Sequence, residues 1–200
     1  MKTQQKVWGN IAPEWAEFKT SPAEHTKRFL QTQKGKILDL GSGSGRNLHK
    51  IKNVKMYLQD FSEEMINFAK EKAKKQNIAA EFVVSDLTKI PFEDEFFNSI
   101  ICNSALHCVE GLENIKKSIK EIYRVLKKGG QAEISVWNKD TKRFGNSEKE
   151  KMIKWRDKGE RYYYLFSPKE VYELFEHVGF EIIFKEDPTR NIVFIVKKSE

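Results

Sequence analysis

The stretch from Lys36 to Arg46 constrains the fold of this chain more than any other. It begins with a short apolar run over residues 37–40, interrupted only by Asp39, which is typical of a buried strand. Glycines then occupy every second position, at Gly41, Gly43 and Gly45. Glycine has no side chain, so the backbone can turn sharply there and approach a ligand closely. The stretch predicts a strand followed by a ligand-binding turn, although an ordinary tight turn between a strand and a helix would use the same residues.

The glycine spacing and the acid before it narrow the type of ligand. The last two glycines are one residue closer together than in the G-x-G-x-x-G loop that brings a helix N-terminus to a dinucleotide pyrophosphate. Asp39 precedes the first glycine by two residues. An acid just upstream of this tighter turn suits a ligand with a cationic amino-acid end.

Strand and helix patterns alternate along the rest of the chain, which is the signature of a doubly wound sheet. Strands are expected at residues 37–40, 54–58, 81–84, 97–102 and 132–137, followed by an antiparallel hairpin of 180–184 and 191–196. Helices are expected at residues 7–15, as a lid or flanking helix, and at 21–33, 46–51, 62–69, 115–126 and from 167 onward. The length predicts a single domain over residues 1–200.

Three polar residues follow expected strand ends, where open α/β sheets bind their ligands. Asp60 could accept hydrogen bonds from both hydroxyls of a ribose, and a role as a helix cap is the alternative, although Ser62 already offers that cap. Asp86 follows the third strand, where an adenine amino group could be read. His107 follows the fourth strand and either faces the ligand or lies on the surface of a connecting loop.

Residues 139–161 interrupt the alternation and concentrate the positive charge. They hold nine basic and five acidic residues, which leaves +4 of the chain's net charge of +7. Ser147 to Glu150 has the pattern of a capping box, so we expect a short helix with its apolar residues at 152, 153 and 155. The segment is either a solvated basic helix or an insertion that contacts a polyanion on the substrate side of the domain.

The composition argues against several classes of protein. Cys102 and Cys108 are too few for a tetrahedral zinc site of their own or for a disulfide scaffold, so we expect free thiols and no metal. No apolar run is long enough to span a bilayer, and the polar N-terminus lacks a signal-peptide core. These features favour a cytoplasmic protein without a membrane partner.

The chain resembles the seven-stranded class I S-adenosylmethionine-dependent methyltransferases over essentially its whole length. The resemblance rests on Asp39–Gly45, Asp60, Asp86–Leu87, Leu126–Gly130 and the closing hairpin. It implies a single Rossmann-like α/β domain, with a mixed sheet of six parallel strands and an antiparallel last strand between helices on both faces. It also implies S-adenosyl-L-methionine as the cofactor.

The same resemblance implies a role for each strand-end residue. The glycine turn and Asp39 would hold the amino-acid end of the cofactor, Asp60 its ribose, and Asp86 with the Leu87 backbone its adenine. Phe61, directly after Asp60, and Asn103, directly after the expected fourth strand, complete the expected cofactor site.

Within this superfamily the chain is similar to the tRNA wobble-uridine carboxymethyl methyltransferases, which esterify a carboxymethyl group on the base. The similarity rests on Ala105–His107, Val136–Trp137, Arg161–Phe166 and Arg190–Asn191. It implies tRNA as the partner and a carboxylate as the methyl acceptor. Such an acceptor needs no proton removed, so positioning of the reactants can suffice.

The similarity also yields a hypothesis for the substrate side of the site. Arg161 and His107 would orient the carboxylate, unless Arg161 holds a phosphate instead. Tyr162 or Tyr163 would pack against the uracil ring, although consecutive tyrosines can equally belong to the core.

The third strand gives an expectation about a protein partner. In this fold it lies at a sheet edge, and Glu81–Val84 contains neither proline nor lysine to protect that edge from pairing. Members of the resembling family are activated by a small zinc-binding protein that adds a strand there. The edge is therefore covered either by such a partner or by the chain's own loops.

Two other functions share the cofactor motifs. One is a small-molecule methyltransferase acting on a quinone precursor or similar acceptor, against which the basic insertion argues. The other is a cofactor-binding protein without catalysis, against which the intact acids at three strand ends argue.

Overall fold

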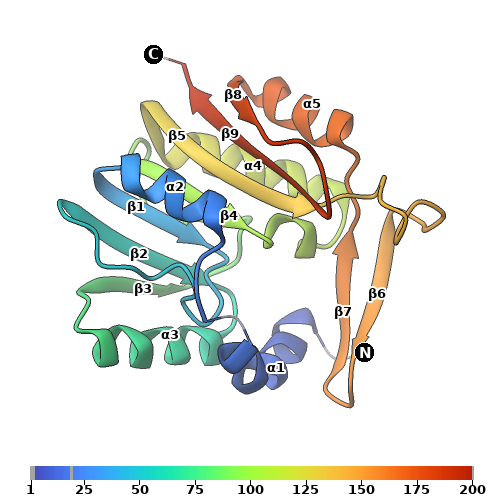
Figure 1. Ribbon diagram of the computed structural model, residues 1–200, viewed down its shortest axis with the longest axis horizontal. Helices are drawn as coiled ribbons and strands as arrows, with labels where there is room; N and C mark the ends of the chain where they lie inside the picture. Colours follow the sequence, from blue (N-terminus) through green and yellow to red (C-terminus); the bar gives the residue numbers. More distant parts are fainter. Residues whose placement is uncertain (1–2, 19, 200) are drawn as a thin grey trace.

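A mixed sheet forms the centre of the computed structural model, which describes residues 3–18 and 20–199. Its seven strands lie in the order β3-β2-β1-β4-β5-β9-β8 (Figure 1). They are β1 (Gly35–Leu40), β2 (Val54–Asp60), β3 (Ala80–Val84), β4 (Phe97–Asn103), β5 (Leu126–Trp137), β8 (Phe180–Lys185) and β9 (Asn191–Lys198). β9 runs antiparallel to its neighbours β5 and β8, and the other pairs are parallel. The predicted fold class and closing hairpin are confirmed, while residues 1, 2, 19 and 200 of the expected domain lie outside the described part.

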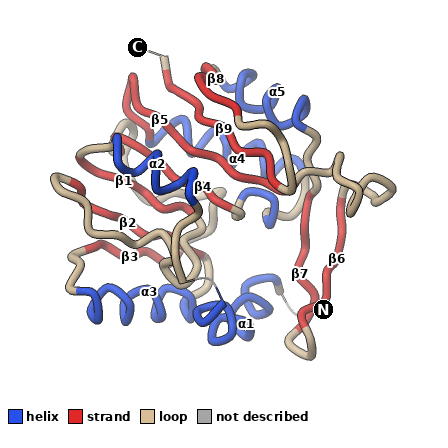
Figure 2. The backbone as a smooth tube through the Cα atoms, viewed as in Figure 1, coloured by secondary structure: helices blue, strands red, loops and turns tan. Residues whose placement is uncertain are grey.

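Helices cover both faces of the sheet. They are α1 (Gln4–Phe18), α2 (Glu24–Thr32), α3 (Glu63–Gln76), α4 (Leu112–Val125) and α5 (Pro168–Val178), with a short 3₁₀ turn, η1, at Leu106–Cys108. α4 and α5 pack on one face and α2 and α3 on the other (Figure 1, Figure 2). α1, the expected flanking helix, packs beside α3 and the C-terminal part of the chain.

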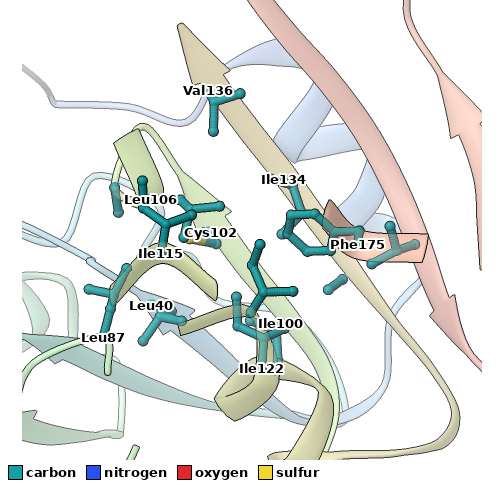
Figure 3. Packing of buried hydrophobic residues seen from close by; sticks show 14 of the residues in the cluster. Leu40, Leu87, Ile100, Cys102, Leu106, Ile115, Ile122, Ile134, Val136 and Phe175 are labelled. Carbon is teal, nitrogen blue, oxygen red and sulfur yellow. The ribbon is translucent and has the colours of Figure 1, made fainter. Parts of the chain in front are cut away.

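The main core lies between the sheet and α4. Ile115, Ile119 and Ile122 recur along α4 at helical spacing and are fully buried. Figure 3 shows residues of α4 packed with Ile100 of β4 and Ile134 of β5. Burying one such side chain stabilises the fold by about 1.5–3 kcal/mol, so this row fixes α4 on the sheet.

Two helices begin where their sequences predict. Ser62 Oγ accepts a hydrogen bond from Met65 N at the start of α3, and Ser167 Oγ accepts one from Glu170 N at the start of α5. The expected start of α2 at Ser21 is wrong. Ala23 is still extended, with φ of −68° and ψ of 158°, so the first helical turn forms after it and has no side-chain cap.

The helix expected at residues 46–51 does not form either. Turns lead from the glycines to β2, and α2 occupies the sheet face that such a helix would cover. Phe29 and Leu30 of α2 share a hydrophobic cluster with Ile37 of β1 and with Leu48, which is buried from within the turns. α2, which precedes β1 in the chain, thus covers this face in place of the helix expected after the glycine turn.

The basic segment forms a β-hairpin, so the expected short helix is wrong. β6 (Glu150–Trp155) pairs with β7 (Gly159–Tyr164) in an antiparallel two-stranded sheet that stands apart from the main sheet (Figure 1). Tyr162 and Tyr164 of β7 point into the main core, and Tyr163 between them joins a second cluster with Trp8. This alternation has the period of a strand, and it overrides the local capping-box pattern.

In the part of the chain that the structure describes, no helix combines the length and the apolar character needed to cross a membrane.

We expect Phe97→Ala to lower the free energy of unfolding by about 3–5 kcal/mol, because Phe97 is fully buried at the start of β4 and its removal leaves a cavity. Chemical denaturation followed by circular dichroism measures this loss. Phe184→Ala is the matched control: its ring is 47% exposed, so the change should stay within about 0.5 kcal/mol. Equal losses in the two variants would contradict the assignment of the core.

Candidate active site

A cleft of about 460 Å³ opens at the carboxyl ends of β1, β2 and β4, on the side where the strand order reverses. The predicted residues that line it come from successive strand ends: Gly41, Gly43, Asp60, Phe61, Asp86, Leu87 and Asn103. The volume lies in the range of small-molecule and cofactor sites. The structure therefore brings together residues from four separate parts of the sequence.

Asp60 fixes the shape of the glycine turn. Its Oδ2 accepts a hydrogen bond from Gly43 N at 2.9 Å, and its Oδ1 accepts one from Ser62 N at 3.0 Å. Burial raises the pKa of this carboxyl from 3.8 to about 6, against the effect of these backbone donors. Each oxygen retains a further lone pair, so the carboxylate can still accept hydrogen bonds from a ligand.

Two glycines are required by the close packing of the turn. Gly41 has φ of +71°, and a Cβ there would overlap the Cβ of Ala105. Gly45 has φ of +78°, and a Cβ there would lie 3.1 Å from the Cβ of Ala69 in α3. The turn is thus pressed between η1 and α3, and larger residues would displace one or the other.

Asp39 lies beneath the turn rather than in the cleft wall. It is 1% exposed, and its Oδ1 accepts a hydrogen bond from Asn47 Nδ2 at 3.1 Å, whereas its Oδ2 has no partner within the described part of the chain. Burial raises its pKa from 3.8 to about 7, although Asn47, Arg46 and Lys72 oppose the shift. Direct contact of Asp39 with a ligand stays a prediction.

The two remaining polar residues of the predicted cofactor site differ in exposure. Asp86 is exposed, and its Oδ1 accepts hydrogen bonds from the amide and hydroxyl of Thr88, which hold the loop after β3. Asn103 is partly buried and donates through its amide nitrogen to Thr26 and Glu133. Both line the cleft, but their roles toward a cofactor stay predictions.

His107 is buried in η1, so a surface position is wrong. Its ring stacks on Trp137 at 5.1 Å, and its Nδ1 accepts a hydrogen bond from Trp137 N at 3.2 Å. Burial, together with the nearby Arg161 guanidinium, lowers its pKa from 6.5 to about 3. The imidazole is therefore neutral at physiological pH, and its Nε2 carries the proton.

Arg161 is a buried cation surrounded by aromatic rings. Its guanidinium lies 4.6 Å from the ring of Trp155, 5.2 Å from Tyr163 and 5.5 Å from Trp8, and the residue is 6% exposed. Within residues 3–18 and 20–199 no acidic side chain forms an ion pair with it, and its Nε has no hydrogen-bond partner. A buried cation with only aromatic partners has unused capacity for an anion.

The predicted tyrosines belong to the core. The Tyr162 hydroxyl accepts a hydrogen bond from Gly111 N at 3.1 Å, and Tyr163 stacks on Trp137 with ring centroids 4.2 Å apart. None of His107, Arg161, Tyr162 and Tyr163 lines the cleft itself. His107, Arg161 and Tyr163 form a layer behind Trp8 and Cys108, which do line the cleft, whereas Tyr162 points into the main core.

The sequence did not predict several residues of the cleft wall. α1 contributes Gln4, Gln5, Trp8 and Trp15, and the turn after β1 contributes Arg46 and Asn47. The aromatic residues near the N-terminus indicated a lid or flanking helix but not its contact with the strand ends. Arg46 directly follows the glycine turn, and this position was the only signal for it.

The fold and the cleft agree with a known family of enzymes. Residues 31–179 match the model of a methyltransferase domain family. The chain belongs to that family. This membership confirms the predicted class of S-adenosylmethionine-dependent methyltransferases and its cofactor.

Two relatives of this methyltransferase carry more specific names. A probable tRNA methyltransferase 9B of Mus musculus is 28% identical over 151 residues, which cover 74% of this chain and 32% of that protein. A tRNA (carboxymethyluridine(34)-5-O)-methyltransferase of Arabidopsis thaliana is 28% identical over 138 residues, covering 68% of this chain and 33% of that protein. The methyltransferase thus spans about a third of the length of these relatives.

One solved structure of the same fold is a complex of the Haloferax volcanii Trm112 methyltransferase activator with a putative methyltransferase. The match has a TM-score of 0.72 and 16% identity and covers 100% of both chains. Identity at this level shows a shared fold.

We expect the pH dependence of stability to change in Asp39→Asn. The raised pKa means that the folded state binds a proton more readily, so the contribution of Asp39 is present below about pH 4 and is lost as the pH rises through about 7. Asn does not titrate, so the variant does not lose this contribution. Its free energy of unfolding should therefore rise relative to that of the parent chain as the pH increases from about 4 to about 7. Denaturation at a series of pH values measures the difference.

Glu121→Gln supplies a control of opposite sign. Its hydrogen bond to Arg124 lowers the pKa of Glu121, so its contribution is present at neutral pH and is lost on acidification. The deficit of Glu121→Gln should therefore shrink as the pH falls. A pH-independent difference for Asp39→Asn would show that its carboxyl titrates normally.

Proposed function

We propose that this methyltransferase transfers the methyl group of S-adenosyl-L-methionine to the carboxyl group of carboxymethyluridine at the wobble position of tRNA. The observation that carries the proposal is Arg161, a buried guanidinium without an acidic partner in the described part of the chain, placed behind the cleft. The names of the relatives support the tRNA substrate.

The residues of the cleft fit the cofactor. Asp60 has free lone pairs for ribose hydroxyls, Asp86 lines the cleft and is exposed for the adenine amino group, and Asn103 Oδ1, unpartnered within the described residues, is an acceptor for the amino-acid end. When bound, S-adenosyl-L-methionine supplies an electrophilic methyl group on a positively charged sulfur. The chain then has to bring a nucleophilic oxygen to that methyl group and hold it in line.

Arg161 provides the charge that an acceptor carboxylate needs. A guanidinium pairs with a carboxylate through parallel hydrogen bonds, and burial strengthens such a pair. The surrounding rings of Trp8, Trp155 and Tyr163 leave little freedom to its side chain. The carboxylate would therefore be held in one orientation, with His107 able to donate only as a neutral group.

The protonation states of two groups near Arg161 are consistent with this acceptor. Burial raises the pKa of the Cys108 thiol, and the pKa of His107 is lowered, so neither group is prepared to take a proton from an attacking hydroxyl or amine. A carboxylate is already ionised at neutral pH. Positioning and partial exclusion of water then contribute the rate enhancement.

The β6–β7 hairpin offers a surface for the tRNA backbone. Lys151 and Lys154 are exposed on β6, whereas Lys149 pairs with Glu170 and Arg156 with Glu14. α1 joins this surface to the cleft, because Gln4 Oε1 accepts a hydrogen bond from Tyr162 N, and Trp155 Nε1 donates one to Glu14. Exposed lysines bind phosphates without reading the sequence of the RNA. A tRNA substrate would place the reaction in the cytoplasm.

The first test is transfer of labelled methyl groups to bulk tRNA from a strain that lacks the protein. We expect alkali-labile label, as an ester requires, in tRNA and none in small quinone precursors. Arg161→Gln should reduce kcat/KM roughly 10- to 100-fold, as for loss of a charge-assisted hydrogen bond, with cofactor affinity retained. Methylation of the quinone precursors instead of tRNA would overturn the proposal.

Binding of the same tRNA tests the hairpin. Lys151→Gln with Lys154→Gln should weaken tRNA binding and flatten its dependence on log salt by somewhat under one unit for each phosphate that is no longer neutralised. Lys74→Gln with Lys75→Gln, at the end of α3 and away from the hairpin, removes the same charge as a control (Figure 1). Equal effects of the two pairs would mean that only net charge matters.

The edge of β3 supports a protein partner as a further part of this proposal. β3 is the outermost strand, and Val84 at its end is 46% exposed. Ser85 N donates to Asp60 O of β2, so the alternate residues Phe82 and Val84 direct their amides away from the sheet. These amides could pair with a strand from a small zinc-binding activator. The complex of the Haloferax volcanii Trm112 methyltransferase activator with a putative methyltransferase of the same fold supports a partner of this kind.

Val84→Pro should abolish binding and activation by such an activator, because it removes an outward donor but no bond to β2. Val84→Thr keeps the amide and serves as the control. Co-purification and methyl transfer with the activator from the same source measure the effect. Full activity of the isolated chain, unchanged when the activator is added, would contradict this part of the proposal.

A further inference from the structure

A cluster of four polar side chains lies between α2, β4 and β5, next to the cleft. It consists of His25, Thr26, Asn103 and Glu133. Glu133 is 1% exposed on a central strand, and Thr26 is fully buried in α2. Buried carboxylates are costly unless hydrogen bonds compensate them, so this arrangement requires an explanation beyond packing.

Glu133 is compensated by three neighbours. Its Oε1 accepts hydrogen bonds from Thr26 Oγ1 at 2.9 Å and from Asn103 Nδ2 at 3.0 Å, and it lies 3.2 Å from His25 Nδ1. Within the described part of the chain, no lysine or arginine pairs with it. The carboxylate therefore acts on its neighbours mainly as a hydrogen-bond acceptor.

This network fixes the orientation of the Asn103 amide. Both protons of Nδ2 are used, one by Glu133 and one by Thr26 Oγ1 at 2.6 Å. The reversed amide would place its oxygen against the carboxylate and the hydroxyl oxygen, where it would be repelled. Asn103 lines the cleft, and its Oδ1 has no hydrogen-bond partner in the described residues. The network thus leaves one unused acceptor on a residue that lines the cleft.

We infer that Glu133 and Thr26 are positioning residues, which hold Asn103 so that its Oδ1 accepts an N–H from the cationic amino-acid end of the cofactor. The inference rests on the proposed cofactor site. The negative carboxylate polarises the amide through its N–H group and makes Oδ1 a stronger acceptor. α2, which supplies Thr26, thereby becomes part of the cofactor site without touching the cofactor.

The test compares two ligands of the complete chain by calorimetric titration. S-adenosylhomocysteine carries the amino-acid end, and 5′-methylthioadenosine carries the same adenosine and sulfur without it. Thr26→Val keeps the shape of the side chain but removes its hydroxyl, and Glu133→Gln keeps the size but removes the charge. Each variant should bind S-adenosylhomocysteine roughly tenfold more weakly, while affinity for methylthioadenosine stays within about twofold.

Thr26→Ser retains the hydroxyl and should bind both ligands as the parent chain does. This rescue separates the hydrogen bond from a general effect on packing, and thermal melts identify any variant that fails to fold. Equal weakening of both ligands by Thr26→Val and Glu133→Gln, or weakening of neither, would overturn the inference. If the parent chain binds neither ligand, the proposed cofactor site fails instead.

Discussion

The hydrogen bonds of the Asp60 carboxylate determine the geometry on which the rest of the site depends. One oxygen accepts from Gly43 in the turn after β1, and the other accepts from Ser62 at the start of α3. Two neighbouring strand ends and a helix are thereby fixed to one side chain. The cost is a buried carboxyl with a raised pKa.

The sheet could be predicted from the sequence because its signals are local. Each of the seven strands contains a short apolar run, and Asp60 and Asp86 lie at or just after strand ends, which parallel pairing brings to one side. The β6–β7 hairpin could not be predicted in this way. Its capping-box pattern favours a helix, and the burial of Tyr162, Tyr163 and Tyr164 that decides for a strand comes from elements elsewhere in the chain.

The contact between α1 and the β6–β7 hairpin, which joins the cofactor side of the cleft to the substrate side, could not be predicted from the sequence for the same reason. α1 and the hairpin are separated by most of the sequence, yet Asn10 Nδ2 donates to Lys158 O, and Glu14 accepts a hydrogen bond from Trp155. No spacing rule connects these positions. Likewise, the sequence did not predict that Asn47 holds Asp39 below the glycine turn, because only packing determines that depth.

The burial of Arg161 bears on which anion it can hold. A phosphodiester is continued by the RNA chain on both sides, so it needs an open surface such as that around Lys151 and Lys154. A carboxylate at the end of a short substituent on a base needs only a narrow approach. Because Arg161 is 6% exposed and enclosed by aromatic rings, it suits the terminal group. Under the proposed function, the exposed lysines would bind the backbone of the substrate, and the buried arginine would bind its reacting group.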